Sequence, residues 1–131
     1  MERTKSKHLV LILARDLAAN VATPMLIADA SRVLVYFNEP AEVVLGESFA
    51  RTGEVPLLEL YSRWQITRAN GDDYPPDQFP MGIALREQQP AHGTVRFLAG
   101  DGVHRTVAVN AYPLLTTTEE FVGAVSIFWE A

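Results

Sequence analysis

Three strand-like segments in the last third of the sequence place the strongest constraint on the fold. Residues 94–99, 103–112 and 121–129 are rich in β-branched and aromatic side chains, which alternate between two faces. A Gly-Asp-Gly sequence at 100–102 predicts a tight hairpin turn between the first two segments. A polar Thr-Thr-Thr-Glu-Glu sequence at 116–120 separates the second from the third. The end of the chain is therefore expected to form an antiparallel meander.

Two shorter strands are expected near the start of the chain, at residues 25–28 and 33–37, joined by an Asp-Ala-Ser-Arg turn. Between the two groups of strands, residues 57–66 supply one or two helical turns. Residues 77–88 form a short helix that Gly82 makes marginal. The simplest arrangement is α+β: a five-stranded antiparallel sheet with the short helices on one face, preceded by an N-terminal helix.

The segment that follows the second strand carries agreeing local signals for a helix. Asn38 is a favoured cap, Pro40 suits a first turn, and Gly46 is a common helix stop. Glu39 and Glu42 lie at the positive end of the helix dipole. We therefore expect a short helix over 39–46, capped by Asn38.

Residues 7–21 contain no Gly or Pro and predict the N-terminal helix. Leu9, Leu13 and Leu17 recur at a spacing of four residues, and a second apolar stripe runs beside them. This apolar arc is wider than packing on one surface requires. Two alternatives follow: the helix is buried within its own domain, or its spare face meets another subunit.

The start of the chain also raises the question of targeting. Its basic first residues and the apolar run at 9–14 would suit a signal peptide, but Arg15 and Asp16 end that run early. The run is also far shorter than the ~20 residues of a membrane span. We therefore expect a cytoplasmic protein with a leading helix and no membrane partner.

Overall composition narrows the function classes. The net charge of −5, with acids and bases mixed along the chain, argues against nucleic acid as a partner because phosphate binding needs a basic face. The absence of cysteine excludes disulfides, thiolate metal sites and thiol-linked chromophores.

Three segments together resemble the PAS domain family over residues 20–130. They are YFNEPAEVVLG at 36–46, Asn-Gly at 70–71 followed by Pro76, Pro80 and Ala84-Leu85, and the run from Gly100 through RTV and YPL to VGAV at 122–125. The resemblance implies a bacterial signalling role, with a pocket between a sheet and its helices. It also implies a homodimer that is often connected to a kinase, cyclase or regulator. On this basis residues 1–22 are a capping or dimerisation helix and residues 23–131 a sensory domain.

No constellation of residues predicts catalysis or metal binding. His8, His92 and His104 do not cluster with acids at ligand spacing, and alternation places His104 on the outer face of its strand. The sequence contains no nucleophile elbow. We therefore expect neither an enzyme nor a metal site.

Alternation along the strands predicts an apolar inner wall facing the helices. With the helix residues opposite, the candidate ligand pocket comprises Phe79, Ile83, Leu85, Val95, Phe97, Val107, Val109, Val125 and Ile127. A flavin ring needs polar partners that this wall does not offer, so flavin, haem and thiol-linked chromophores are not expected. The same residues would also be needed to fill an ordinary core.

In the last strand, the residues that alternate with Val125 and Ile127 are expected on the outer surface of the sheet. They are Ala124, Ser126 and Phe128. With Leu9, Leu13 and Leu17 they form a candidate dimer or interaction surface. Two hypotheses result. The first is a sensor that binds a small, apolar ligand and relays the signal through dimerisation or an effector. The second is a ligand-free protein–protein interaction or dimerisation module with a filled core.

Overall fold

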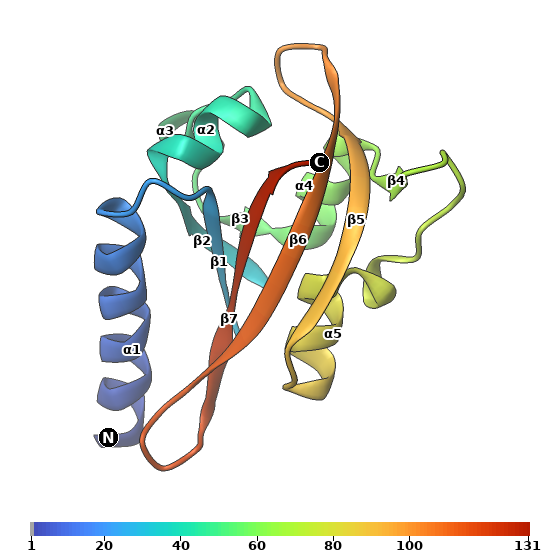
Figure 1. Cartoon of the computed structure of the whole chain (residues 1–131). Helices are drawn as coiled ribbons and strands as arrows, with labels where there is room; N and C mark the ends of the chain where they lie inside the picture. The colour runs from blue at the N-terminus through green and yellow to red at the C-terminus, as the bar shows by residue number, and fades with distance from the viewer. Residues whose placement is uncertain (1) are drawn as a thin grey trace.

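An antiparallel sheet with the strand order β3-β2-β1-β7-β6-β5-β4 forms the centre of the fold (Figure 1). The structure is a computed structural model that describes residues 2–131, with side chains described from Leu9 onward. The strands are β1 (Met25–Asp29), β2 (Val33–Phe37), β3 (Val55–Pro56), β4 (Thr67–Arg68), β5 (Ala91–Leu98), β6 (His104–Leu115) and β7 (Phe121–Glu130). The helices are α1 (Glu2–Ala19), α2 (Glu39–Leu45), α3 (Phe49–Thr52), α4 (Leu57–Trp64), the 3-10 turn η1 (Pro76–Gln78) and α5 (Pro80–Glu87).

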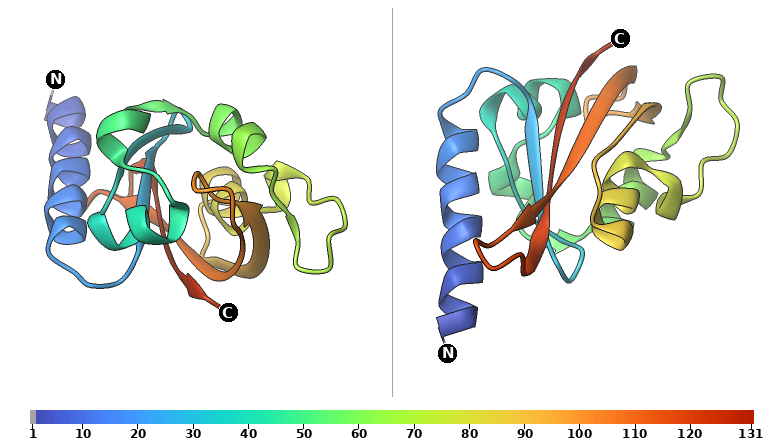
Figure 2. Two further views of the ribbon diagram at one scale, coloured as in Figure 1. Left: turned by 90° about the horizontal axis from the view of Figure 1, so that it is seen from above. Right: turned by 60° about the horizontal axis from the view of Figure 1, so that its bottom comes forward.

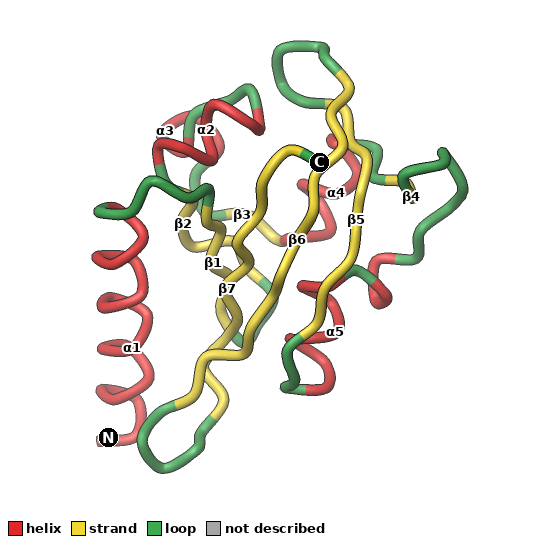
Figure 3. The backbone as a smooth tube through the Cα atoms, viewed as in Figure 1, coloured by secondary structure: helices red, strands yellow, loops and turns green. Residues whose placement is uncertain are grey.

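The expected α+β architecture is confirmed, with a sheet of seven strands in place of five within the described residues. The five predicted strands are β1, β2, β5, β6 and β7. The two additional strands, β3 and β4, have two residues each and add to the outer edges of the sheet. A strand of two residues is too short to show an alternation of apolar and polar side chains in the sequence. Figure 3 shows the hairpin loops that join β5 to β6 and β6 to β7.

The sheet separates two helical layers. Helix α5 packs against β5, β6 and β7, whereas α1 packs against β1, β6 and β7. Figure 2 shows α1 on the side of the sheet away from α4 and α5. The two faces of β7 are therefore both covered by helices, α5 on one side and α1 on the other.

The predicted cap of α2 is confirmed. The Asn38 side chain accepts a hydrogen bond from the Ala41 amide at 3.1 Å, and Gly46 ends the helix in the left-handed region with φ 71°. The turn between β1 and β2 is also closed locally, because the Asp29 carboxylate accepts hydrogen bonds from the Ser31 and Val33 amides at 2.9 and 3.1 Å.

The expected helix over 77–88 is divided at Phe79 into η1 and α5. Gly82 has a positive role in this arrangement, since a Cβ atom there would collide with the Pro76 carbonyl oxygen. The absence of a side chain at Gly82 therefore permits η1 to lie directly against α5. Among the described residues, no helix is both long and apolar enough to cross a membrane.

Candidate functional site

A cavity of about 80 Å³ lies between the inner face of the sheet and helices α4 and α5. Its wall is almost entirely apolar and is formed by Leu26, Leu45, Tyr61, Trp64, Ile66, Phe79, Pro80, Met81, Val95, Phe97, Val107, Val109, Ser126 and Phe128. For comparison, an engineered apolar cavity of about 150 Å³ in another protein binds benzene. The present cavity is therefore large enough for a few atoms, and larger guests would require movement of its wall.

Five of the nine residues predicted to form a pocket lie on this wall. They come from the start of α5 and from the two strands at that end of the sheet: Phe79, Val95, Phe97, Val107 and Val109. The pairing of Val95 with Val107 holds the strand residues on one face. The alternation that the sequence predicts for β5 and β6 is therefore correct.

The predicted faces of β7 are inverted. Ser126 and Phe128 line the cavity and Ala124 is fully buried, whereas Val125 and Ile127 are absent from the cavity wall. The register explains this placement, because Val109 pairs with Phe128 and the two therefore share a face. Both faces of β7 are apolar since α1 covers the outer one, so alternation alone does not identify the inner face.

Two predicted residues of α5 also lie elsewhere. Ile83 is half-buried and does not line the cavity. Leu85 is buried but faces a groove on another side of the helix, together with Leu57. Phe79 precedes α5 as its cap and has an extended backbone, so helical spacing counted from Phe79 does not predict the directions of Ile83 and Leu85 four and six residues later.

Helix α4 contributes the wall residues Tyr61 and Trp64, which the sequence analysis missed, and the pattern of burial along this helix could have revealed it. Leu60 and Trp64 are buried at a spacing of four residues, and Leu57 is buried three residues before Leu60. This is the spacing of a single buried helical face. Counting apolar positions over 57–64 at the helical period would therefore have identified this helix as part of the core. The other missed wall residues are Leu26, Leu45, Ile66, Pro80 and Met81.

Aromatic rings dominate the cavity wall. The Trp64 and Phe97 rings lie 6.1 Å apart and tilted, and the Tyr61 and Phe79 rings lie 4.9 Å apart edge to face. The Tyr74 ring also packs edge to face against Phe79, with ring centroids 4.8 Å apart. Edge-to-face pairs at these separations are favourable and restrict the rings. The wall is therefore largely preformed, with Met81 as its most adaptable side chain.

Three polar groups border this apolar space. The Trp64 indole Nε1 donates a hydrogen bond to Glu47 Oε1 at 3.2 Å and is thereby satisfied. Within the described part of the chain, the hydroxyl groups of Ser126 and Tyr61 form no hydrogen bond with the protein. Burial raises the pKa of the Tyr61 hydroxyl well above its ordinary value, although the nearby Arg32 guanidinium partly opposes this shift. Both hydroxyls are thus neutral donors available to a guest.

The described residues contain no group of three or more His, Cys, Asp or Glu side chains arranged to hold a metal ion. His92 and His104 are exposed on the surface, with His104 on the outer face as predicted, while the His8 side chain lies outside the described residues. A haem or a tricyclic flavin does not fit a cavity of about 80 Å³ with this wall. The site suits a small neutral molecule.

A second notable surface runs along α1. Leu9, Leu13 and Leu17 are 53%, 57% and 60% exposed, and Ile12 adds to the same stripe at 43%. The opposite face of the helix packs on the sheet, where Ala18 is fully buried. The wide apolar arc predicted for this helix therefore has two parts: one is buried against the sheet, and the other is exposed to solvent.

Comparison with known proteins gives matches at the level of structure only. No protein-family profile matches the sequence, and no curated protein matches it either. The chain is similar to the PAS domain of a protein from Colwellia psychrerythraea (TM-score 0.59, 15% identity, covering 93% of this chain and 97% of that one). It is also similar to the PAS domain of nitrogen regulation protein NR(II) from Vibrio parahaemolyticus (0.61, 18%, 91% and 98%).

A third similar structure is the Rhodobacter sphaeroides LOV protein, with a TM-score of 0.69, 11% identity, and coverage of 99% of this chain and 68% of that one. Identities this low establish the fold and nothing finer. The resemblance read from the three sequence segments is confirmed at that level: this chain has the PAS fold.

Proposed function

We propose that this chain is a non-catalytic sensory module that binds a small, largely apolar molecule in the aromatic cavity. It transmits the bound state through a homodimer formed by α1, or through a signalling effector such as a kinase, cyclase or regulator. In this proposal residues 1–22 serve dimerisation, residues 23–131 serve sensing, and the protein acts in the cytoplasm.

The observation that carries the proposal is the Ser126 hydroxyl. Ser126 is a buried residue in the wall of an apolar cavity, and its hydroxyl has no hydrogen-bond partner among the described residues. No fully enclosed side-chain nitrogen or oxygen atom of these residues lacks a partner, so this hydroxyl opens onto accessible space. A hydroxyl that opens onto an apolar cavity is free to bind a water molecule or a polar guest. A guest that hydrogen-bonds Ser126 accounts for both the space and the unpaired group.

The exposed stripe of α1 supports the dimer. Four large apolar side chains on one face of one helix are more than a solvated helix usually presents. A second copy of the same stripe would cover it symmetrically, as dimers with two-fold symmetry do. The same helix contacts β7, which carries Ser126, so a change in the cavity has a short path to the interface.

A ligand-free interaction module is the second candidate. It is favoured by the small size of the cavity, about half the volume that holds benzene in the reference case. In that case the cavity would be a packing defect occupied by water at Ser126, and the α1 stripe would be the functional surface. The two candidates differ in whether the cavity binds a guest that affects the dimer.

The cavity is tested by NMR titration of isotope-labelled protein with phenol and with toluene, which are similar in size but differ in the hydroxyl. Phenol is expected to saturate shifts in β7 and α5, and Ser126→Ala is expected to weaken phenol binding several-fold while leaving toluene unchanged. Val107→Phe should block both. The matched control is Val103→Phe, at a position that is 50% exposed outside the cavity. No saturable shift with either probe would favour the ligand-free module.

The dimer is tested by light scattering. The wild-type chain is expected to have the mass of a dimer, and Leu13→Glu with Leu17→Glu should produce a folded monomer by placing charges in the interface. Val103→Glu is the matched control, since Val103 is 50% exposed in the loop between β5 and β6, which lies apart from α1 in Figure 1. A wild-type monomer at high micromolar concentration would contradict the dimer.

A further inference from the structure

A separate groove lies outside the aromatic cavity, on the surface between α4, α5 and the β1–β2 turn. It has a volume of about 320 Å³ and is lined by Leu57, Leu58, Leu85, Tyr61, Pro76, Gly82, Arg32 and Asp77. Leu58 is 67% exposed and stands at its edge, while Leu57 and Leu85 are buried at its floor. The groove is thus an open apolar trough with two charged residues at its margin.

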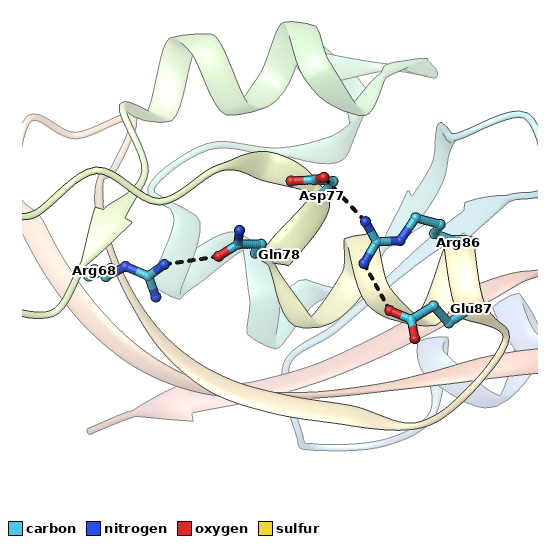
Figure 4. A network of polar contacts seen from close by, with 5 residues as sticks. All are labelled: Arg68, Asp77, Gln78, Arg86 and Glu87. Carbon is cyan, nitrogen blue, oxygen red and sulfur yellow. Dashed lines mark hydrogen bonds and ion pairs between the residues drawn. The ribbon is translucent and has the colours of Figure 1, made fainter.

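The two charged residues differ in how they are satisfied. The Asp77 carboxylate lies 3.2 Å from the Arg86 guanidinium, which also contacts Glu87 at 2.8 Å (Figure 4). Arg32, in contrast, forms no ion pair with any described residue. The negative charge at the margin is therefore largely offset, whereas the positive charge is available to a ligand.

The position of Arg32 is fixed by the fold. Its backbone is in the left-handed region at φ 64°, within the tight turn between β1 and β2. Its amide donates to the Asp29 carbonyl at 2.9 Å, and its carbonyl accepts from the Leu57 amide at the start of α4 at 2.9 Å. An arginine held at both backbone groups presents its side chain from a constant point beside the apolar floor.

Tyr61 forms a common wall between this groove and the aromatic cavity, because it lines both. Its hydroxyl has no hydrogen-bond partner within the described residues, and the Arg32 guanidinium is near enough to favour its ionised form. The groove therefore combines one unpaired cation with an apolar floor, and Tyr61 separates it from the aromatic cavity.

From this combination we infer that the groove binds a small amphipathic monocarboxylate. The carboxylate accepts hydrogen bonds from the Arg32 guanidinium, whose planar fork matches two carboxylate oxygens. The hydrocarbon part lies on Leu57, Leu58 and Leu85 and ends at Tyr61. A phosphate-rich ligand does not suit the groove, since Arg32 is its single unpaired cation and most of the wall is apolar.

The inference is tested by isothermal titration calorimetry of the full chain with sodium octanoate and with 1-octanol. Octanoate is expected to bind more tightly than octanol. Arg32→Gln should weaken octanoate binding about tenfold and leave octanol unchanged. Leu58→Glu, which adds a negative charge at the edge of the groove, should weaken octanoate binding more than octanol binding.

Two matched controls are available. Arg63→Gln removes another arginine without an ion pair among the described residues, outside the groove, and Val43→Glu adds the same charge on an exposed apolar position of α2. Neither should change octanoate binding. Equal affinity for octanoate and octanol, an unchanged octanoate affinity in Arg32→Gln, or no saturable octanoate binding would each overturn the inference. The phenol titration reports on Ser126 and not on Arg32, so the cavity and the groove succeed or fail separately.

Discussion

Substitution of Asn38 tests how the N-terminal helix is attached to the sheet. The Asn38 side chain is completely buried and forms four hydrogen bonds with the backbone. Its Nδ2 group donates to the Ala18 and Thr23 carbonyls, both at 2.9 Å, and its Oδ1 atom accepts from the Met25 and Ala41 amides at 3.0 and 3.1 Å. One side chain thus joins the end of α1, the following linker, β1 and α2.

The expected cost of Asn38→Ala follows from these four bonds. A net contribution of about 0.5–1.5 kcal/mol for each gives a loss of about 2–6 kcal/mol in the free energy of unfolding. A helix cap alone would cost about 0.5–2 kcal/mol. Asn38→Asp is nearly isosteric and retains both acceptor bonds, but its carboxylate faces the Ala18 and Thr23 carbonyl oxygens. Its destabilisation should therefore be larger at pH 7 than at pH 4, where the carboxyl group is protonated and again donates.

Urea denaturation followed by circular dichroism measures these changes. Ser48→Ala is the matched control, because the Ser48 hydroxyl caps α3 by accepting one exposed hydrogen bond of 3.3 Å from the Arg51 amide. We expect that control to lose about 0.5–1 kcal/mol. If Asn38→Ala lost no more than Ser48→Ala, the reasoning from four buried hydrogen bonds would be refuted.

Two further predictions concern β7 and the β5–β6 hairpin. Phe128→Ala should lower the free energy of unfolding by about 3–5 kcal/mol, as large-to-small changes at buried positions do. Trp129→Ala, at a position that is 43% exposed, should lower it by about 1 kcal/mol. If urea denaturation gave the reverse order, Trp129 and not Phe128 would be on the inner face of β7. The Arg105 guanidinium donates hydrogen bonds to the Asp101 carboxylate at 2.8 and 3.0 Å and lowers the pKa of that carboxyl group in the folded protein. The stability that this pair contributes is therefore present above the unfolded-state pKa near 4. It is lost as the pH falls through the lower pKa of the folded state. The melting temperature of the wild type should therefore exceed that of Asp101→Asn at pH 7, and the difference should disappear on acidification below about pH 4; a difference independent of pH would contradict this.

Local signals in the sequence predicted the features that depend on near neighbours. The cap at Asn38 and the stop at Gly46 involve residues within one helix, and the structure forms both. The other three hydrogen bonds of Asn38 reach 13 to 20 residues back along the chain. No local pattern identifies such partners, so the sequence predicted the cap but not its role in holding α1.

The faces of β7 show a second limit. Alternation separates the faces of a strand when one is polar, and β6 meets that condition through His104 and Asn110. In β7 the outer face is covered by α1, so Val125 and Ile127 are as apolar as the inner residues. Only the register with β6 decides between the two sets, and register is a property of the folded sheet. The groove at Arg32 was missed for a related reason, because it is assembled from segments distant in the chain.

The central claim, a ligand-responsive dimer, is tested most directly by native mass spectrometry of the purified protein alone, with phenol and with octanoate. The account predicts the mass of a dimer, bound phenol that Ser126→Ala reduces, bound octanoate that Arg32→Gln reduces, and a change in the dimer-to-monomer ratio when phenol is bound. A monomer without bound molecules under all three conditions would contradict it.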